Sequence, residues 1–146
     1  MRARSRARGW ALQLLYAWEA RDRQPALSAA LESFSAERTI SPANLEYLER
    51  LIDTISGHAG EIDRALETSL TNWRMERLST IDRNILRVGA AEILFLDDVP
   101  PRVSIQEAIV LAEKYGTRES PRFVNGVLDA LMRRHDEAGV RDGDGP

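Results

Sequence analysis

Apolar residues recur every three or four positions along most of this 146-residue chain, which is the period of an amphipathic helix. The stripe Trp10, Leu14 and Trp18 shows the pattern clearly, and it returns in six later segments between proline, glycine or serine breaks. No segment of five or more residues alternates apolar and polar side chains as a half-buried strand would. The pattern predicts an all-α fold of about seven helices in two packed helical subbundles, with no sheet.

Local signals predict where some of these helices begin. Ser41 followed by Pro42 combines an N-cap with a first-turn proline. Ser104 and Glu107 form an S-x-x-E capping box, which predicts a helix start at that point. Gly126 lies inside the last predicted helix, where glycine costs about 1 kcal/mol relative to alanine. We therefore expect another helix or a ligand to approach closely at Gly126.

The two ends of the chain differ from its middle. Arginines at positions 2, 4, 6 and 8 alternate with alanine or serine and leave no apolar face, so residues 1–9 are predicted to be a flexible arginine-rich arm. Residues 136–146 lack apolar periodicity and are predicted to be a disordered tail. The length suits one domain, so we expect a single all-helical domain over residues 10–135.

The net charge of −3 hides a segregation of charge along the chain. Residues 1–23 hold six arginines and two acidic residues, a charge of +4, and the remaining chain carries −7. Arginine guanidinia fit phosphate oxygens, and RNA affinity comes largely from such contacts. From composition alone, an RNA-binding arm and a merely solubilising terminus remain equally open.

The inventory of reactive side chains disfavours an enzyme. The chain has no cysteine, one lysine and two histidines, and the histidines are not spaced as metal ligands on one helix face. Glycine-rich phosphate loops are also missing, so we expect no metal and no cofactor. There is no apolar run of membrane-spanning length and no secretory signal, which predicts a cytoplasmic protein without a membrane segment.

Two stretches of the chain carry a distinctive sequence. The first is ARGWALQLLYAW at residues 7–18, directly after the first arginines. The second runs over residues 81–129 and ends in FVNGVLD at residues 123–129, the most specific piece. Both stretches resemble the NusB family of bacterial transcription antitermination factors. The resemblance covers nearly the whole chain, although residues 25–73 match in helical pattern more than in sequence.

The resemblance implies a non-catalytic RNA-binding protein of two small helical subbundles. Such a factor binds single-stranded boxA RNA together with ribosomal protein S-ten (NusE). Within the RNA polymerase antitermination complex, which includes NusA and NusG, it promotes read-through of terminators, notably in ribosomal RNA operons. The family includes monomers and homodimers, so a homodimer stays possible.

The resemblance also implies site residues. The basic arm maps onto Arg4, Arg6 and Arg8, which should contact RNA phosphates, and a second RNA-facing patch maps onto the start of the last helix. The members of this patch are Glu119, Arg122 and Phe123, with Arg118 added by proximity. Tyr16 and Asp82 match positions linked with the ribosomal-protein face. Their alternative roles are structural, at the rim of the core for Tyr16 and in the first turn of a helix for Asp82.

Two other functions remain open at this point. One is a helical protein-binding adaptor without RNA specificity, whose acidic body docks a basic partner. The other is the NusB-like RNA-binding domain found in ribosomal RNA methyltransferases, which we disfavour because no cofactor-binding α/β pattern follows. Specific binding of RNA separates the adaptor from the antitermination factor.

Overall fold

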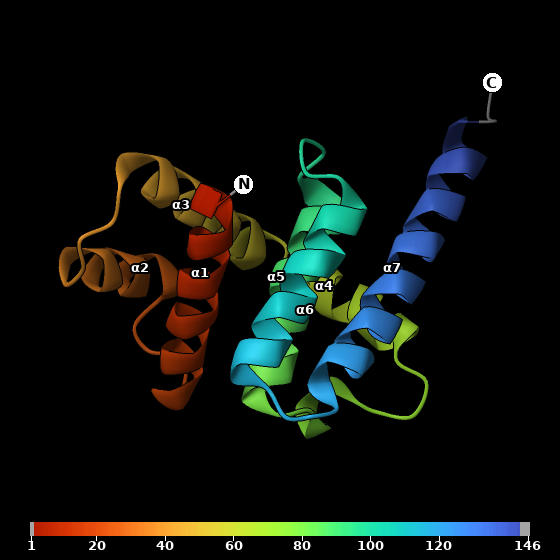
Figure 1. Cartoon of the computed structure of the whole chain (residues 1–146), viewed down its shortest axis with the longest axis horizontal. Coiled ribbons are helices and arrows are strands. Elements are labelled where there is room, and N and C mark those ends of the chain that lie inside the picture. The colour runs from red at the N-terminus through yellow and green to blue at the C-terminus, as the bar shows by residue number, and fades with distance from the viewer. Residues whose placement is uncertain (1, 144–146) are drawn as a thin grey trace.

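The structure is a computed structural model that describes the backbone of residues 2–143 and the side chains of residues 4–139. Within that part of the chain there are seven α-helices, one short 3-10 helix and no strand (Figure 1). The helices are α1 (Arg2–Ala20), α2 (Leu27–Ala36), α3 (Pro42–Gly57), α4 (Ala59–Ser69), the 3-10 helix η1 (Met75–Arg77), α5 (Thr80–Phe95), α6 (Pro101–Tyr115) and α7 (Ser120–Gly143). The prediction of an all-α fold is confirmed.

Helix α5 joins the two halves of the molecule. On one side it packs against α1 and α3, and on the other against α4, α6 and α7 (Figure 1). Every residue from Asn84 to Ile93 is buried, as expected of a helix surrounded by neighbours. The two subbundles therefore share one core that runs along α5.

Serine caps begin two of the predicted helices. The Ser41 hydroxyl accepts a hydrogen bond from the Asn44 backbone N–H at 3.4 Å, and the Ser79 hydroxyl accepts one from the Asp82 backbone N–H at 3.1 Å. Each cap satisfies a backbone donor that the first turn of a helix leaves unpaired. Such caps are local signals, because the capping residues lie within three positions of the groups they bind, and the sequence predicted the one at Ser41.

The predicted capping box at Ser104 and Glu107 is wrong. Helix α6 begins at Pro101, with Pro100 in the capping position. Proline fits the first helical position, since its fixed φ suits the helix and its missing N–H would have no helical partner there. Ser104 is consequently buried inside the helix at 1% exposure, and Glu107 binds a residue of α1 instead.

No helix approaches closely at Gly126, and the close helix approach occurs instead at Gly89. A Cβ atom at Gly126 would meet nothing within 4 Å, whereas one at Gly89 would lie 2.7 Å from Leu128 Cδ1. Gly89 therefore lets α7 approach α5 more closely than any side chain would allow.

Both chain ends are more ordered than the sequence predicts. Residues 2–9 form the first turns of α1 rather than a flexible arm, because Ala7 is buried in the core and Arg8 pairs with the buried Glu92 carboxylate. Helix α7 continues to Gly143, so residues 136–143 of the predicted tail are helical. The rest of that tail and Met1 lie outside the described residues.

Candidate nucleic-acid interface

The helical form of residues 2–9 separates the three predicted arginine contacts. Residues two apart on an α-helix point about 200° away from each other, so Arg6 faces away from Arg4 and Arg8. The guanidinium carbons of Arg4 and Arg8 lie 4.6 and 5.6 Å from the centre of the Tyr47 ring. Arg6 is exposed, and no ion pair within the described residues involves it. The three arginines therefore have different roles.

Arg8 holds α1 to the core and is not a surface cation. It is 1% exposed, and its Nε donates to Glu92 Oε2 at 2.6 Å while its Nη1 donates to Glu107 Oε1 at 3.1 Å. The Tyr47 hydroxyl donates to the same Glu92 oxygen, and burial together with the Glu92 carboxylate raises the pKa of Tyr47 well above its ordinary value. The geometry does not support the expected phosphate contact of Arg8, because a buried and paired guanidinium cannot reach RNA.

Arg4 is partly exposed and paired at the turn before α6. Its Nη2 donates to Asp98 Oδ2 at 2.9 Å, and Arg50 of α3 donates to both oxygens of the same carboxylate at 2.5 and 2.9 Å. Hydrogen bonds from Arg50 and Arg4 hold the pKa of Asp98 well below its usual value. Because Arg50 already neutralises Asp98, Arg4 can exchange this exposed contact for a phosphate.

The second predicted patch lies at the turn between α6 and α7. Arg118, Glu119 and Arg122 are exposed, while Phe123 is half-buried and packs against the core. Glu119 and Phe123 line a hollow of about 250 Å³ together with Asp82 and Trp73. The structure therefore places Asp82, the expected partner-binding residue, beside the expected RNA-binding residues.

The structure does not bring the two basic patches together. Arg4 contacts Asp98, which precedes α6, whereas Arg118 follows the end of α6. Helix α6 has 15 residues and is therefore about 22 Å long. In Figure 1 the first turns of α1 accordingly lie in the upper part of the view and the α6–α7 turn lies near its bottom.

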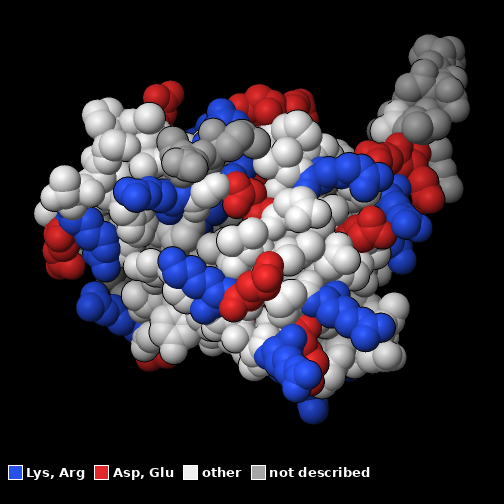
Figure 2. All heavy atoms as spheres, viewed as in Figure 1, with Lys and Arg blue, Asp and Glu red and all other residues white. Residues whose placement is uncertain are grey.

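A groove lies between α1 and α6, and none of its lining residues belongs to the α6–α7 turn. Its volume is about 360 Å³, and its lining residues include Arg6, Gly9, Trp10, Val110, Lys114 and Tyr115. In Figure 2 basic side chains are scattered over the face that contains α1 and α6, rather than gathered in one patch. Tyr16, the other expected partner contact, is 48% exposed on α1.

Sequence reasoning missed the groove because its walls come from helices about 100 residues apart. Trp10 was interpreted as part of a core stripe, and in the structure it packs against the core while still lining the groove. Lys114 and Tyr115 carried no signal beyond the rarity of lysine in this chain. Only the packing of α1 against α6 brings these side chains together.

A second ion-pair network fixes the other end of α1. Glu19 accepts hydrogen bonds from Arg83, at 2.6 Å, and from Arg87, which also binds Asp63 of α4 at 3.0 and 3.1 Å. Burial alone would raise the pKa of Glu19, but the hydrogen bonds from Arg83 and Arg87 outweigh it and lower that pKa. With Arg8 paired near the start of α1 and Glu19 near its end, α1 is anchored to α5 at two places.

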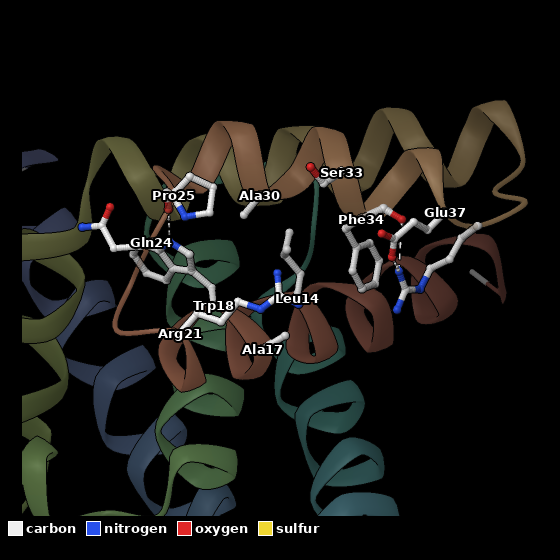
Figure 3. A pocket seen from close by; sticks show the side chains of 11 residues that line it. Leu14, Ala17, Trp18, Arg21, Gln24, Pro25, Ala30, Ser33, Phe34 and Glu37 are labelled. Carbon is white, nitrogen blue, oxygen red and sulfur yellow. Dashed lines mark hydrogen bonds and ion pairs between the residues drawn. The ribbon is translucent and has the colours of Figure 1, made fainter.

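The hollow between α1 and α2 is smaller than the groove between α1 and α6. It measures about 140 Å³, and Trp18 and Phe34 supply aromatic surface to it (Figure 3). The Trp18 indole N–H is already used, because it donates to the Pro25 carbonyl at 2.7 Å. Sites for drug-sized ligands usually measure about 300–1,000 Å³, so this hollow is too small for a nucleotide.

Two further searches of the described residues gave no candidates. They contain no group of three or more His, Cys, Asp or Glu side chains placed to hold a metal ion. Nor does any helix among them have both the length and the apolar character needed to cross a bilayer.

Comparison with known proteins relates this chain to one family. Residues 5–133 match the model of the NusB family. The transcription antitermination protein NusB of Thermobifida fusca is 41% identical over 90% of both chains, and that of Trichlorobacter lovleyi is 40% identical over 90% of this chain and 91% of the relative.

Solved structures agree with this relationship. NusB of T. maritima superposes with a TM-score of 0.84 at 38% identity, covering 90% of this chain and 92% of that one. A crystal structure of antitermination factors NusB and NusE in complex with dsRNA matches with a TM-score of 0.76 at 34% identity, covering 92% and 98% of the two chains.

Proposed function

Because this chain belongs to the NusB family, we propose that it is an RNA-binding transcription antitermination factor. In this proposal it binds single-stranded boxA RNA together with ribosomal protein S-ten (NusE), in the cytoplasm and without catalysis. The complex, which includes NusA and NusG, promotes read-through by RNA polymerase, notably in ribosomal RNA operons. The structural relative in which NusB and NusE are in complex with dsRNA supports NusE and RNA as the two classes of partner.

The observation that carries the proposal is the exposed basic surface at the two ends of α6. Arg4 and Arg6 lie on the ordered first turns of α1, and Arg118 and Arg122 lie around the start of α7. A cation that is already ordered loses less conformational entropy when it binds a phosphate than one on a disordered arm. We therefore assign the phosphate contacts to these four arginines and leave Arg8 out.

The partner protein is assigned to the surface near the start of α5. Tyr16 is exposed on α1, and one Asp82 oxygen, Oδ1, is buried with no hydrogen-bond partner among the described residues. An unpaired carboxylate oxygen favours a donor from a basic partner. Because Asp82 shares its hollow with Glu119 and Phe123, the ribosomal protein and the RNA would meet there.

A binding titration tests the proposal. Fluorescence anisotropy of a labelled boxA RNA is measured against a scrambled RNA of the same composition, with and without S-ten. We expect tighter binding of boxA RNA and a further gain when S-ten is present. Equal binding of both RNAs with no gain from S-ten would refute the proposal, and an adaptor without RNA specificity would give that result.

A further inference from the structure

We propose that Arg4 and Arg50 form a phosphate-binding fork, and that the Asp98 carboxylate occupies this fork until an RNA phosphate displaces it. This inference rests on the proposed function and adds to it a fifth arginine, from α3, and an internal competitor. Arg50 donates to both Asp98 oxygens, at 2.5 and 2.9 Å, and Arg4 donates to one of them at 2.9 Å. Guanidinium groups bind phosphate oxygens with the same planar, paired geometry that they use for carboxylates.

All three side chains of the fork reach solvent. The Arg4, Arg50 and Asp98 side chains are 36%, 41% and 43% exposed. Asp98 lies in the turn between α5 and α6, and within the described residues its carboxylate has no hydrogen-bond partner besides the two arginines. Exposed ion pairs contribute little to stability, so the carboxylate can turn into water when another anion takes its place.

Tyr47 holds both guanidinium groups in place independently of Asp98. The guanidinium carbons of Arg4 and Arg50 lie 4.6 and 5.9 Å from the centre of its ring, within the range of cation–π interactions. The ring itself is buried, and its hydroxyl donates to Glu92. Departure of the carboxylate would therefore leave two ordered cations side by side, which lowers the entropic cost of binding a phosphate.

The Asp98 carboxylate is charged near neutral pH. Hydrogen bonds from Arg50 and Arg4 hold the pKa of Asp98 well below its usual value. Protonation therefore does not release the two arginines, whereas a competing anion can. The fork holds two positive charges and one negative charge, so one positive charge remains to attract a phosphate.

An RNA strand suits this fork better than an acidic segment of a protein. A protein carboxylate would replace Asp98 like for like, without new contacts. A strand of RNA instead carries a row of phosphates, and Arg6 is exposed on the same first turns of α1 with no ion pair in the described part of the chain. If the fork bound an acidic protein segment, replacing Asp98 would leave RNA affinity unchanged.

Two neighbouring aspartates allow a test at equal net charge. Asp98→Asn should tighten RNA binding about fivefold, the effect of removing a like charge about 4 Å from the phosphate in water. The matched control is Asp97→Asn, which removes the same charge from an exposed neighbour outside the fork and should change affinity by less than about twofold. Anisotropy titrations use boxA RNA and the scrambled RNA. Both should bind Asp98→Asn more tightly to the same degree, because phosphate contacts do not depend on sequence.

A second pair of variants tests the arginine from α3. Arg50→Gln should weaken RNA binding and make the slope of log affinity against log salt shallower by about 0.7, the contribution of one phosphate contact to a single strand. The matched control is Arg64→Gln, an exposed arginine on α4 outside the fork, which should behave like wild type. Circular dichroism establishes that each variant is folded before its affinity is compared.

The outcomes separate this inference from the proposed function. If wild-type protein prefers boxA RNA but folded Asp98→Asn binds it like Asp97→Asn, the fork does not hold RNA and the function stands. Weaker binding by Asp98→Asn would mean that the carboxylate only positions Arg4 and Arg50, and would also overturn the inference. If wild-type protein shows no preference for boxA RNA, the proposed function fails, whereas tighter binding of both RNAs by Asp98→Asn would still support the fork.

Discussion

Replacing Arg8 tests whether the start of α1 is held by a buried ion pair. The Arg8 and Glu92 side chains are 2% and 0% exposed, and their charged atoms lie 2.6 Å apart. Arg8→Met keeps much of the side-chain volume but leaves the Glu92 carboxylate buried beside only the Tyr47 hydroxyl. Breaking a buried pair in this way costs about 3–5 kcal/mol of unfolding free energy.

A double variant separates the lost pair from lost packing. Arg8 Nη2 and Glu92 Oε1 have no hydrogen-bond partner within the described residues, so the wild-type pair is incompletely satisfied. Replacing both charges should therefore cost less than replacing one. We expect Arg8→Met combined with Glu92→Gln to recover about 2 kcal/mol relative to Arg8→Met alone.

Urea unfolding followed by far-ultraviolet circular dichroism measures these free energies. The control is Arg133→Met, which removes an exposed pair with Asp129 at 3.1 Å and should cost less than about 1 kcal/mol. RNA affinity should fall together with stability in Arg8→Met, because α1 carries Arg4 and Arg6. If Arg8→Met costs no more than Arg133→Met, the reasoning about the buried pair is refuted.

Four further substitutions have expected outcomes. Gly89→Val should destabilise the fold by about 1–3 kcal/mol, because its Cβ would lie 2.7 Å from Leu128 Cδ1. Gly126→Ala should stabilise α7 by about 0.5–1 kcal/mol, because a Cβ there meets nothing within 4 Å. Urea unfolding in which Gly89→Val is the more stable of the two variants would contradict both expectations. The pKa of Glu19 is lowered in the folded state, so its stabilising effect is present above its unfolded pKa of about 4.3 and is lost as pH falls through the folded value. Glu19→Gln should therefore flatten the acid side of the stability–pH curve, and an unchanged curve would count against the network. Glu119→Asn removes a carboxylate from the basic turn and should tighten boxA binding at fixed salt, and an unchanged or weaker affinity would contradict that role.

The parts of the fold that were predictable depend on short-range signals. Helical periodicity is set by residues three and four apart, and the caps at Ser41 and Ser79 bind backbone groups three residues away. The start of α6 was mistaken because two local signals compete there. Pro101 at the first helical position determines the outcome, so Ser104 lies inside the helix and does not cap it.

The site was less predictable because its properties depend on distant partners. Glu92 and Glu107 lie 84 and 99 positions from Arg8, so its burial has no local signature. From the sequence, an arginine among other arginines is expected to be exposed to solvent. In the structure, however, Arg8 is as buried as the core leucines. The groove likewise exists only where α1 meets α6, and Trp10 could be recognised as helical but not as a groove residue.

The most direct test of RNA binding by Arg4 and Arg6, on the ordered first turns of α1, is the salt dependence of boxA binding. Affinity is measured by anisotropy over a range of salt concentrations, with S-ten present, for wild type, Arg64→Gln and the double variant Arg4→Gln/Arg6→Gln. We expect equal slopes for wild type and Arg64→Gln, and a slope shallower by about 1.4 for the double variant, since each lost phosphate contact removes about 0.7. Parallel lines for all three proteins would contradict binding of RNA by Arg4 and Arg6.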